Sequence, residues 1–423
     1  IRLSLVGSEM CIRDRNKIMK PIVRAGRMKP VHSDIRGPLF VEAMKRQKQG
    51  IDILKLNTGN PATFGFGLPD SIKNALMEHM QDGVGYCDFK GMPQARQAIC
   101  DYETSKGIKG ITPDDVFIGN GVSEVVSFAL TPLLNDGDEV LVPSPSYSLW
   151  GNSVYLEDGK PVFYTCDEQA NWYPDIQDIR SKITDKTKAI VIINPNNPTG
   201  VLYPKEILLE IIQVAREFGL LIFADEIYDR LVMDGKQHIS LASLTEDVPV
   251  ITLNGLSKSH CLCGYRCGWM VISGPRELTE DYRQGIIQLT SLRLCANTMA
   301  QIVIPAALDD METPASMVRP GGRIYEQREA TVRELEKIDG LSFVKNDAAF
   351  YIFPKLNVKK FNITNDKQFA HDLLDATNIL LVPGSGFDWK DPDHFRIVML
   401  PQADILSDAI RRMGTFLDGY KQK

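Results

Sequence analysis

The chain has 423 residues, too many for one small domain and enough for a large core plus a second domain. Apolar residues make up 43% and charged residues 24%, as in ordinary globular proteins. The net charge of −6 provides no basic surface for a nucleic acid, and no apolar run approaches the roughly 18 residues needed to cross a bilayer. We therefore expect neither a nucleic acid nor a membrane as a partner.

Residues 1–18 differ in character from the rest of the chain. They lack the apolar core of a signal peptide and the Arg- and Ser-rich amphipathic pattern of a transit peptide. The string SLVGSEMCIRDR resembles translated adaptor sequence. We expect residues 1–18 to be a non-native extension that precedes a natural start at Met19.

Two elements are predicted in the following stretch. Residues 38–49 carry apolar side chains at near-helical spacing and predict a short amphipathic helix. The strand ILKL at 53–56 comes next and ends in NTGNPATFGFG, a polar and glycine-rich loop. Such a loop lets a ligand approach the backbone closely, although an ordinary connecting loop has the same composition.

The stretch 116–134 predicts a strand, a tight glycine turn and a helix. Gly121, Val122 and Ser123 open the helix, so that free backbone N–H groups and the positive end of the helix dipole would face an anion. The next strand, EVLVPS, places an aromatic side chain, Tyr147, just beyond its end. Strands and helices then alternate as in a doubly wound α/β sheet.

Three consecutive strands carry polar residues at their ends: AIVIINPNNPTG (189–200), LLIFADEIYD (220–229) and VITLNGLSK (250–258). Each is an apolar, β-branched run of the kind buried on both faces of a parallel sheet. Because ligands of open α/β sheets bind at the carboxyl ends of the strands, these polar residues are expected to meet in one site. They are Asn194, Asn197, Asp225, Tyr228, Ser257 and Lys258.

Pyridoxal phosphate chemistry requires such a set. A lysine amine binds the aldehyde of this cofactor, and a carboxylate pairs with the ring pyridinium so that the ring can take up electrons. Asn and Tyr side chains can hydrogen-bond the ring hydroxyl. Arg266, eight residues after Lys258, is placed to grip a phosphate together with the helix start at 121–123. A single lysine such as Lys258 would most often face solvent, whereas the joint pattern is specific.

The succession NNPTG, DEIY, SK and GYRCGW resembles the class I/II aminotransferases of the fold-type-I pyridoxal phosphate enzymes. The resemblance implies an α/β fold whose large domain, residues 66–310, contains a mostly parallel sheet of seven strands. Residues 19–65 would supply an arm and part of a discontinuous small α+β domain, which residues 311–423 complete. The active site is expected in the cleft between the two domains.

The resemblance also implies roles for single residues around pyridoxal 5′-phosphate. Lys258, Asp225 and Tyr228 would be catalytic, and the aromatic ring of Tyr147 would stack on the cofactor. Tyr86 would reach the cofactor phosphate of the neighbouring subunit in a homodimer with shared active sites. Many relatives have Ser three positions before the lysine, where this chain has Gly255. We therefore expect the phosphate to be held by the amides at 121–123, by Arg266 and by Ser257.

Substrate-binding residues follow from the same resemblance. Arg396 lies among apolar strand residues in HFRIV, and a buried guanidinium requires an anionic partner. The family uses this arginine for the α-carboxylate of its substrates, and a salt bridge to a protein Asp or Glu is the alternative. The family loop at Gly59, together with Asn197, would also contact the substrate.

The strings DIRGPL, GYCDFKG, RLCAN and GGRIYEQR look like those of bacterial alanine (glutamate–pyruvate) aminotransferases. We therefore expect ping-pong exchange of an amino group between L-alanine or L-glutamate and 2-oxoglutarate or pyruvate. Arg36 and Arg293 are candidates for the second carboxylate of glutamate, although either could form a structural salt bridge instead.

Other functions fit the sequence less well. An aromatic or broad-specificity aminotransferase is the first alternative, followed by a β-lyase or a cyclopropane-forming synthase with nearly the same residues. A regulator fused to a DNA-binding head would need several dozen additional N-terminal residues. A degenerate structural homologue is disfavoured because the set Lys258, Asp225, Tyr228, Arg266 and Arg396 is intact.

Eight cysteines lie scattered at positions 11, 87, 100, 166, 261, 263, 267 and 295. The group at 261–267 lacks the paired spacing of a zinc site and falls between the lysine and Arg266, where a metal would crowd the cofactor. We expect no metal and interpret the cysteines as reduced thiols of a cytoplasmic protein.

Overall fold

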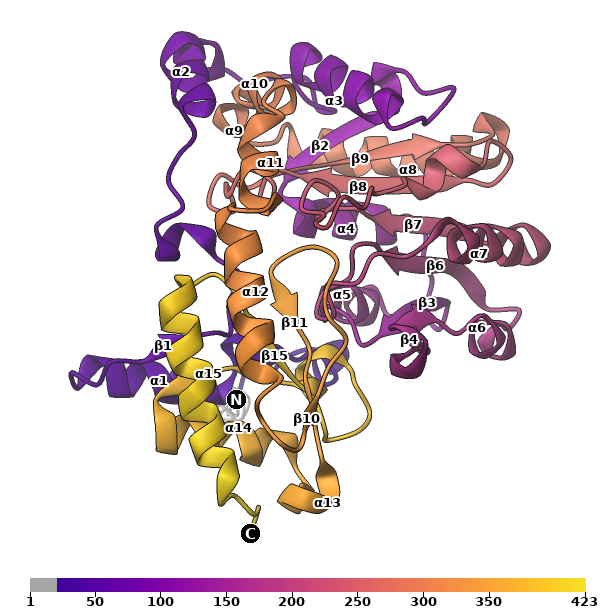
Figure 1. The fold of residues 1–423 in the computed structure, drawn as a ribbon. Helices are drawn as coiled ribbons and strands as arrows, with labels where there is room; N and C mark the ends of the chain where they lie inside the picture. Colours follow the sequence, from indigo (N-terminus) through magenta and orange to yellow (C-terminus); the bar gives the residue numbers. More distant parts are fainter. Residues whose placement is uncertain (1–20) are drawn as a thin grey trace, which may run out of the picture.

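A twisted sheet of eight strands forms the larger part of the computed structural model, which describes residues 21–423 (Figure 1). Its inner strands are parallel, while β9 is antiparallel to both of its neighbours and β5 is antiparallel to β4. In spatial order the strands are β2 (Val116–Asn120), β9 (Cys267–Ser273), β8 (Val250–Gly255), β7 (Leu221–Asp225), β6 (Thr187–Ile193), β3 (Glu139–Ser144), β4 (Lys160–Asp167) and β5 (Tyr173–Pro174). The predicted mostly parallel sheet is confirmed, and the two-residue strand β5 is the addition to the expected seven.

Alternation along the strands explains why both faces of the sheet are covered. In β6, Ile190 and Ile192 contact one apolar cluster, whereas Val191 and Ile193 contact the cluster on the other face. Helix α7 (Lys205–Phe218) packs on the first face, and α4 (Val122–Leu130) and α5 (Leu149–Leu156) pack on the second. Nearly all residues of the inner strands are therefore buried, as the apolar runs predict.

Further helices cover the β2–β9 edge and the end of the sheet, and Figure 1 shows several of them gathered above β2. Figure 1 also shows α12 (Arg323–Leu335) leading from this region to a second, smaller group of strands and helices. The remaining helices of this part of the chain are α2 (Asp70–His79), α3 (Pro93–Ser105), α6 (Ile176–Lys182), α8 (Arg276–Arg293), α9 (Thr298–Ile302), α10 (Ile304–Asp309) and α11 (Glu312–Val318).

The second group of elements joins the N-terminal part of the chain to its C-terminal part. Strand β1 (Leu54–Lys55) pairs in parallel with β13 (Ile379–Leu380), and Leu56 belongs to the same apolar cluster as residues after position 330. The remaining elements are α1 (Pro38–Lys48), α12 (Arg323–Leu335), α13 (Val358–Phe361), α14 (Asp366–Thr377), α15 (Ala403–Asp418), β10 (Leu341–Ser342), β11 (Tyr351–Ile352), β12 (Lys355–Leu356), β14 (Val382–Pro383) and β15 (Phe395–Val398).

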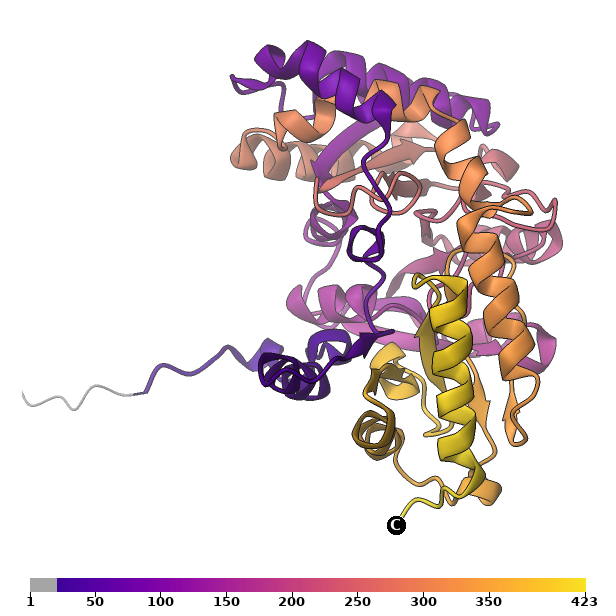
Figure 2. The same ribbon diagram turned by 60° about the vertical axis from the view of Figure 1, so that its left-hand side comes forward.

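The second group contains a three-stranded sheet in the order β11–β15–β14. Helices α12 and α15 pack against each other beside this sheet, as Figures 1 and 2 show in orange and yellow. The amphipathic helix predicted at 38–49 is confirmed as α1, and the long helix α15 lies near the C-terminus.

Residues 21–25 extend away from the rest of the described chain (Figure 2), and Ile22 and Val23 are exposed, whereas Arg27 pairs with Asp158 at 3.2 Å. The expectation of a non-native extension at 1–18 lies outside the described residues. Within residues 21–423 no single helix is long and apolar enough to cross a membrane. Helix α8 and the stretch Thr298–Asp309 reach that length and composition only together, and they are bent by 118°.

Candidate active site

A cleft of about 660 Å³ lies at the carboxyl ends of β7 and β8, where strands β11 and β15 of the second group meet the large sheet. Most of the residues that sequence patterns assign to the site line it together. They are Arg36, Gly59, Val122, Ser123, Tyr147, Asn197, Asp225, Tyr228, Ser257, Lys258, Arg266 and Arg396. Five of the six residues expected at the three strand ends thus line one cleft, and Asn194 is the exception.

Lys258 enters the cleft from the turn that follows β8. Its Nζ donates a hydrogen bond to the Gly59 carbonyl at 3.0 Å and lies 5.8 Å from the ring centroid of Phe350. Ser257 lies beside it in the cleft wall. Among residues 21–423 the lysine amine thus has one neutral acceptor, so that it can leave this carbonyl for a ligand.

Asp225 is the last residue of β7 and is only 5% exposed. Its carboxylate accepts hydrogen bonds from Trp150 Nε1 at 3.0 Å and from the Ile227 amide at 3.4 Å. Burial raises the pKa of Asp225 to about 6, because no Lys, Arg or His among residues 21–423 pairs with it. A cationic ring N–H facing this carboxylate would supply the counter-charge that it lacks.

Tyr228 lies one turn further along the same segment and is buried. Its hydroxyl oxygen lies 3.0 Å from the hydroxyl oxygen of Tyr351, and burial raises the pKa of Tyr228 well above its ordinary value. The phenol is therefore a neutral hydrogen-bond donor near neutral pH. Tyr147, which is partly exposed, lines the same cleft.

An anion cradle forms where the turn before α4 meets Arg266. Gly121 has φ +82°, and a Cβ at this position would lie 2.2 Å from Arg266 Nη2, so only glycine permits this approach. Arg266 itself has φ +57° and donates from Nη1 to the Cys263 carbonyl at 2.8 Å. The first amides of α4, including those of Val122 and Ser123, have no intrahelical acceptor. These donors and the guanidinium can hold a phosphate from two sides.

The glycine at position 255 has a physical cause in the sheet. Gly255 pairs with Gly268 of β9, and a Cβ on it would lie 2.5 Å from the Cys267 carbonyl oxygen. No side chain fits there, so the serine that many relatives carry has no counterpart at this position. Ser257, which lines the cleft, offers the nearby hydroxyl instead.

Arg396 is 1% exposed and forms no ion pair with any Asp or Glu of the described residues. Its Nη1 donates to Asn197 Oδ1 at 2.9 Å, its Nη2 donates to the Asn57 carbonyl, and its Nε has no partner. The protein salt bridge considered above is thus absent from residues 21–423. A buried guanidinium held only by neutral groups can pair with a carboxylate that enters the cleft.

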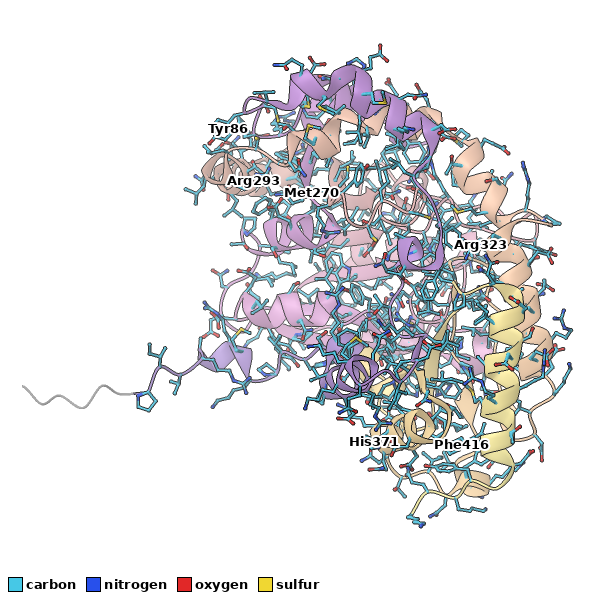
Figure 3. All side chains as sticks on the ribbon, turned by 90° about the vertical axis from the view of Figure 1, so that its left-hand side faces the viewer. Tyr86, Met270, Arg293, Arg323, His371 and Phe416 are labelled. Carbon is cyan, nitrogen blue, oxygen red and sulfur yellow. The ribbon has the colours of Figure 1, made fainter. Side chains whose placement is uncertain are left out.

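Two predicted site residues lie outside the cleft of their own chain. The Arg293 guanidinium pairs with Glu124 at 2.5 Å and donates to the carbonyls of Phe89 and Ile118. Within one chain it therefore forms a structural salt bridge, because Glu124 at the start of α4 and two backbone carbonyls engage Nη1 and Nη2, while its buried Nε has no partner among the described residues. Tyr86 is 83% exposed and lies near Arg293 at one side of the molecule (Figure 3).

Asn194 also lies outside the cleft. Its side-chain oxygen accepts from the Tyr203 amide at 2.9 Å, and its carbonyl contacts His238 at 3.1 Å. Of the three asparagines at 194, 196 and 197, only Asn197 lines the cleft.

Several residues of the site escape sequence patterns. Trp150 binds Asp225 from α5, and Tyr351 comes from β11, more than a hundred residues after Tyr228. Phe387 places its ring centroid 4.6 Å from the Arg396 guanidinium. The sequence signal for Trp150 is its place three positions after Tyr147, and the signal for Tyr351 is the aromatic-rich string FYIF at 350–353. Both patterns are equally typical of a core.

Another cluster of potential metal ligands is already paired with a buried lysine. Glu226, Asp229 and His238 offer ligand atoms within 4.8 Å of one another. Lys106 Nζ lies 2.7 Å from Glu226 Oε2 and 3.1 Å from Asp229 Oδ2. Because this lysine supplies the positive charge, we assign no metal to the cluster.

The fold and the cleft define a transaminase-type α/β enzyme, and the chain belongs to the aminotransferase class I and II family, whose model matches residues 51–410. It is 49% identical over 404 residues to a glutamate–pyruvate aminotransferase of Haemophilus influenzae, covering 96% of this chain and 100% of that protein. An aminotransferase structure from Escherichia coli superimposes with a TM-score of 0.94 at 46% identity, covering 96% of this chain and 100% of that one. An alanine aminotransferase from Pyrococcus furiosus gives a TM-score of 0.89 at 41% identity, with 94% and 100% covered.

Enzymes of this class depend on pyridoxal 5′-phosphate, and the residues present fit that cofactor. The buried Asp225 carboxylate has no cationic partner among the described residues, the Lys258 amine faces the cleft, and Gly121 leaves room for Arg266 beside free amides. Each of these features matches one part of the cofactor: the ring nitrogen, the aldehyde and the phosphate. The chain is therefore a pyridoxal-phosphate-dependent aminotransferase.

Proposed function

We propose that this enzyme transfers the amino group between L-alanine or L-glutamate and 2-oxoglutarate or pyruvate. The observation that carries the proposal is the buried Arg396, whose guanidinium lacks a carboxylate partner among the described residues. It lines the same cleft as Lys258, so a bound α-amino acid would place its amine and Cα near the lysine. The names of the relatives support alanine and glutamate as substrates.

In this proposal the chain's own residues bind, orient and move a proton. Pyridoxal phosphate supplies an electron sink for the pair left on the substrate Cα. Arg396 and Asn197 hold the α-carboxylate, while the Lys258 amine removes the Cα proton of the donor amino acid and, in the reverse half-reaction, delivers a proton to the Cα of the product amino acid. Asp225 stays ionised opposite the ring nitrogen, and Tyr228 donates to the ring oxygen. The first 2-oxo acid leaves before the second enters, which gives ping-pong kinetics.

Three sets of hydrogen-bond donors are assigned to the cofactor phosphate. They are the first amides of α4, Arg266 and the Ser257 hydroxyl. Support comes from the free helix start and the close approach of Arg266 to Gly121. With its phosphate fixed at this end, the cofactor would extend toward Asp225 along the cleft.

We further propose a homodimer in which Tyr86 completes the phosphate site of the partner subunit. Tyr86 lies in an exposed apolar patch with Val84, Leu292 and Leu294, which are between 53% and 83% exposed. The two segments of the patch are packed together, since Thr298 Oγ1 donates to the Gly83 carbonyl at 2.6 Å. Patches of this kind are usually covered by another protein surface.

The division into an arm with a small-domain part at 19–65, a large domain at 66–310 and a C-terminal part at 311–423 remains our proposal. It is supported by the β1–β13 pairing. A cytoplasmic location is likewise inferred, from cysteines that are all free thiols among the described residues.

A panel of amino donors tests the substrate assignment. Purified enzyme is assayed with alanine, glutamate, aspartate, tyrosine and phenylalanine against 2-oxoglutarate and against pyruvate. We expect alanine with 2-oxoglutarate, and glutamate with pyruvate, to give the highest kcat/KM. A preference for tyrosine or phenylalanine over alanine would replace the assignment by an aromatic aminotransferase, and ammonia release without a 2-oxo acid acceptor would indicate a lyase.

A further inference from the structure

Tyr351 stands at the meeting point of two groups that the proposed function treats separately. It begins strand β11, is 2% exposed and lines the cleft. Its hydroxyl oxygen lies 3.0 Å from that of Tyr228, and its ring centroid lies 4.6 Å from the Arg396 guanidinium. One side chain therefore contacts both the tyrosine assigned to the cofactor and the arginine assigned to the substrate.

The space around the Tyr351 hydroxyl is closed on its remaining side. A Cβ at Gly59 would lie 2.3 Å from this oxygen, so the glycine backbone packs directly against it. The carbonyl of the same glycine accepts the hydrogen bond from Lys258 Nζ at 3.0 Å. Within residues 21–423, Tyr228 is the hydrogen-bond partner of the Tyr351 hydroxyl.

A contact between two phenols can run in either direction, and the surroundings select one. If Tyr228 donated to Tyr351, its only proton would be used in that hydrogen bond and would not be available to a ligand. If Tyr351 donates, its own hydroxyl is satisfied and the Tyr228 proton is directed into the cleft. Donation by Tyr351 also polarises Tyr228 and makes it a stronger donor, since linked hydrogen bonds reinforce one another.

We propose that Tyr351 is a positioning residue that orients the Tyr228 proton toward the cofactor ring oxygen and backs the Arg396 guanidinium with its ring. The proposal rests on the proposed function, which places Tyr228 at the ring oxygen. The two parts of the side chain act separately. The hydroxyl works through Tyr228, whereas the ring works through Arg396 by a cation–π contact.

A role in packing alone would not require the hydroxyl. Phe350 and Phe387 already surround the same region with plain rings, and phenylalanine at 351 would fill the same volume. The hydroxyl of Tyr351 is buried, and a buried hydroxyl is stable only when it is hydrogen-bonded. The hydrogen bond to Tyr228 is therefore the specific consequence of having tyrosine here.

The test is a pH titration of the visible absorption of the cofactor-loaded enzyme, with wild type, Tyr351→Phe, Tyr228→Phe and Tyr420→Phe. A donor to the ring oxygen stabilises negative charge there, so weakening it makes proton loss from the bound chromophore less favourable and raises the midpoint. We expect a rise of roughly 0.2 to 0.7 pH units for Tyr351→Phe and a larger rise for Tyr228→Phe. Tyr420→Phe loses a phenol hydrogen bond to Asp372 away from the cleft and should leave the midpoint unchanged.

Steady-state kinetics separate the ring from the hydroxyl. Tyr351→Phe keeps the ring beside Arg396, so we expect a lower kcat with a KM for alanine within about twofold of wild type. Tyr351→Leu removes the ring, and we expect its KM for alanine to rise roughly three- to thirtyfold. Thermal unfolding of the cofactor-free proteins shows whether either variant merely loosens the fold.

The outcomes distinguish this inference from the function on which it rests. If Tyr228→Phe raises the midpoint and Tyr351→Phe does not, the positioning role of Tyr351 is wrong and the proposed function stands. If neither variant moves the midpoint, the place of Tyr228 at the ring oxygen is wrong as well. A Tyr351→Phe enzyme that is changed only in melting temperature would overturn the inference and leave Tyr351 a packing residue.

Discussion

Arg36 lies in the cleft wall, exposed and without an ion pair to any described residue, and it is the arginine best placed for a second substrate carboxylate. Arg36→Ala should raise the KM for glutamate and 2-oxoglutarate about ten- to a hundredfold, because a charge-assisted pair contributes roughly 1.5–3 kcal/mol. The KM for alanine and pyruvate should stay nearly unchanged. Arg36→Lys, which keeps the charge but not the fork, should fall between the two. An equal loss with all four substrates would exclude Arg36 as the specificity residue.

Asp225 makes cofactor binding dependent on pH. The raised pKa of about 6 means that the carboxyl is neutral below pH 6 and ionised above it in the cofactor-free protein. Only the carboxylate can pair with a cationic ring nitrogen, so the dissociation constant for pyridoxal phosphate should increase as pH falls from 8 to 5. Asp225→Asn should bind weakly at both pH values. Equilibrium dialysis of the cofactor-free protein measures this, and a flat profile for wild type would contradict the assignment.

Residues at strand ends could be predicted from the sequence, whereas residues that act through distant partners could not. Asp225 and Lys258 follow apolar runs that fix their place at the sheet edge. Tyr351 and Trp150 reach the site from separate elements, and nothing local distinguishes them from core aromatics. The sequence alone could not decide whether Arg293 binds a substrate carboxylate or forms a structural salt bridge, because its partner Glu124 lies 169 residues away.

At the scale of elements, the turn after β7 has two faces with different tasks. Asp225 and Tyr228 face the cleft, while Glu226 and Asp229 point to the opposite side and meet Lys106 from the C-terminal end of α3. The same ammonium lies 2.8 Å from the buried carboxylate of Glu103. One lysine thus contacts three buried acids and anchors the turn that carries Asp225 and Tyr228.

Lys106→Met should therefore destabilise the protein by about 3–5 kcal/mol, since it leaves buried carboxylates without their counter-charge. Lys109→Met is the matched control three residues away, because its ion pair with Glu246 is exposed on both sides and its loss should change stability little. Lys106→Arg should recover part of the loss. Urea unfolding of the cofactor-free variants measures the free energies. Equal stability of the two Met variants would show that the cluster does not hold the turn.

The hydrophobic periodicity of the sequence identified the helices and strands better than it identified which strands pair. The apolar runs of β6, β7 and β8 and the amphipathic pattern of α15 are local properties of the chain. The pairing of β1 with β13 joins residues more than three hundred positions apart, and β5 has only two residues. Such contacts depend on the folded whole, so they carry no periodic signal.

At the scale of the whole molecule, the proposed homodimer rests on the exposed patch around Tyr86. Mixing inactive Lys258→Ala with inactive Tyr86→Ala protomers should restore activity. A hybrid dimer would contain one site with both an intact lysine and an intact partner tyrosine, and random mixing should give up to about a quarter of wild-type activity. Sedimentation of each variant alone provides the control for assembly. A fully active monomer would refute the shared site.

We propose that Lys258 is the residue that carries pyridoxal phosphate, and every other role in the cleft depends on it. The most direct measurement is reduction of the cofactor-loaded enzyme with borohydride, followed by proteolysis and mass spectrometry of the labelled peptides. We predict one labelled peptide that contains Lys258, and no label in Lys258→Ala, which should keep its fold and lose turnover. Label on a different lysine, or no label in a wild-type protein saturated with the cofactor, would contradict the account.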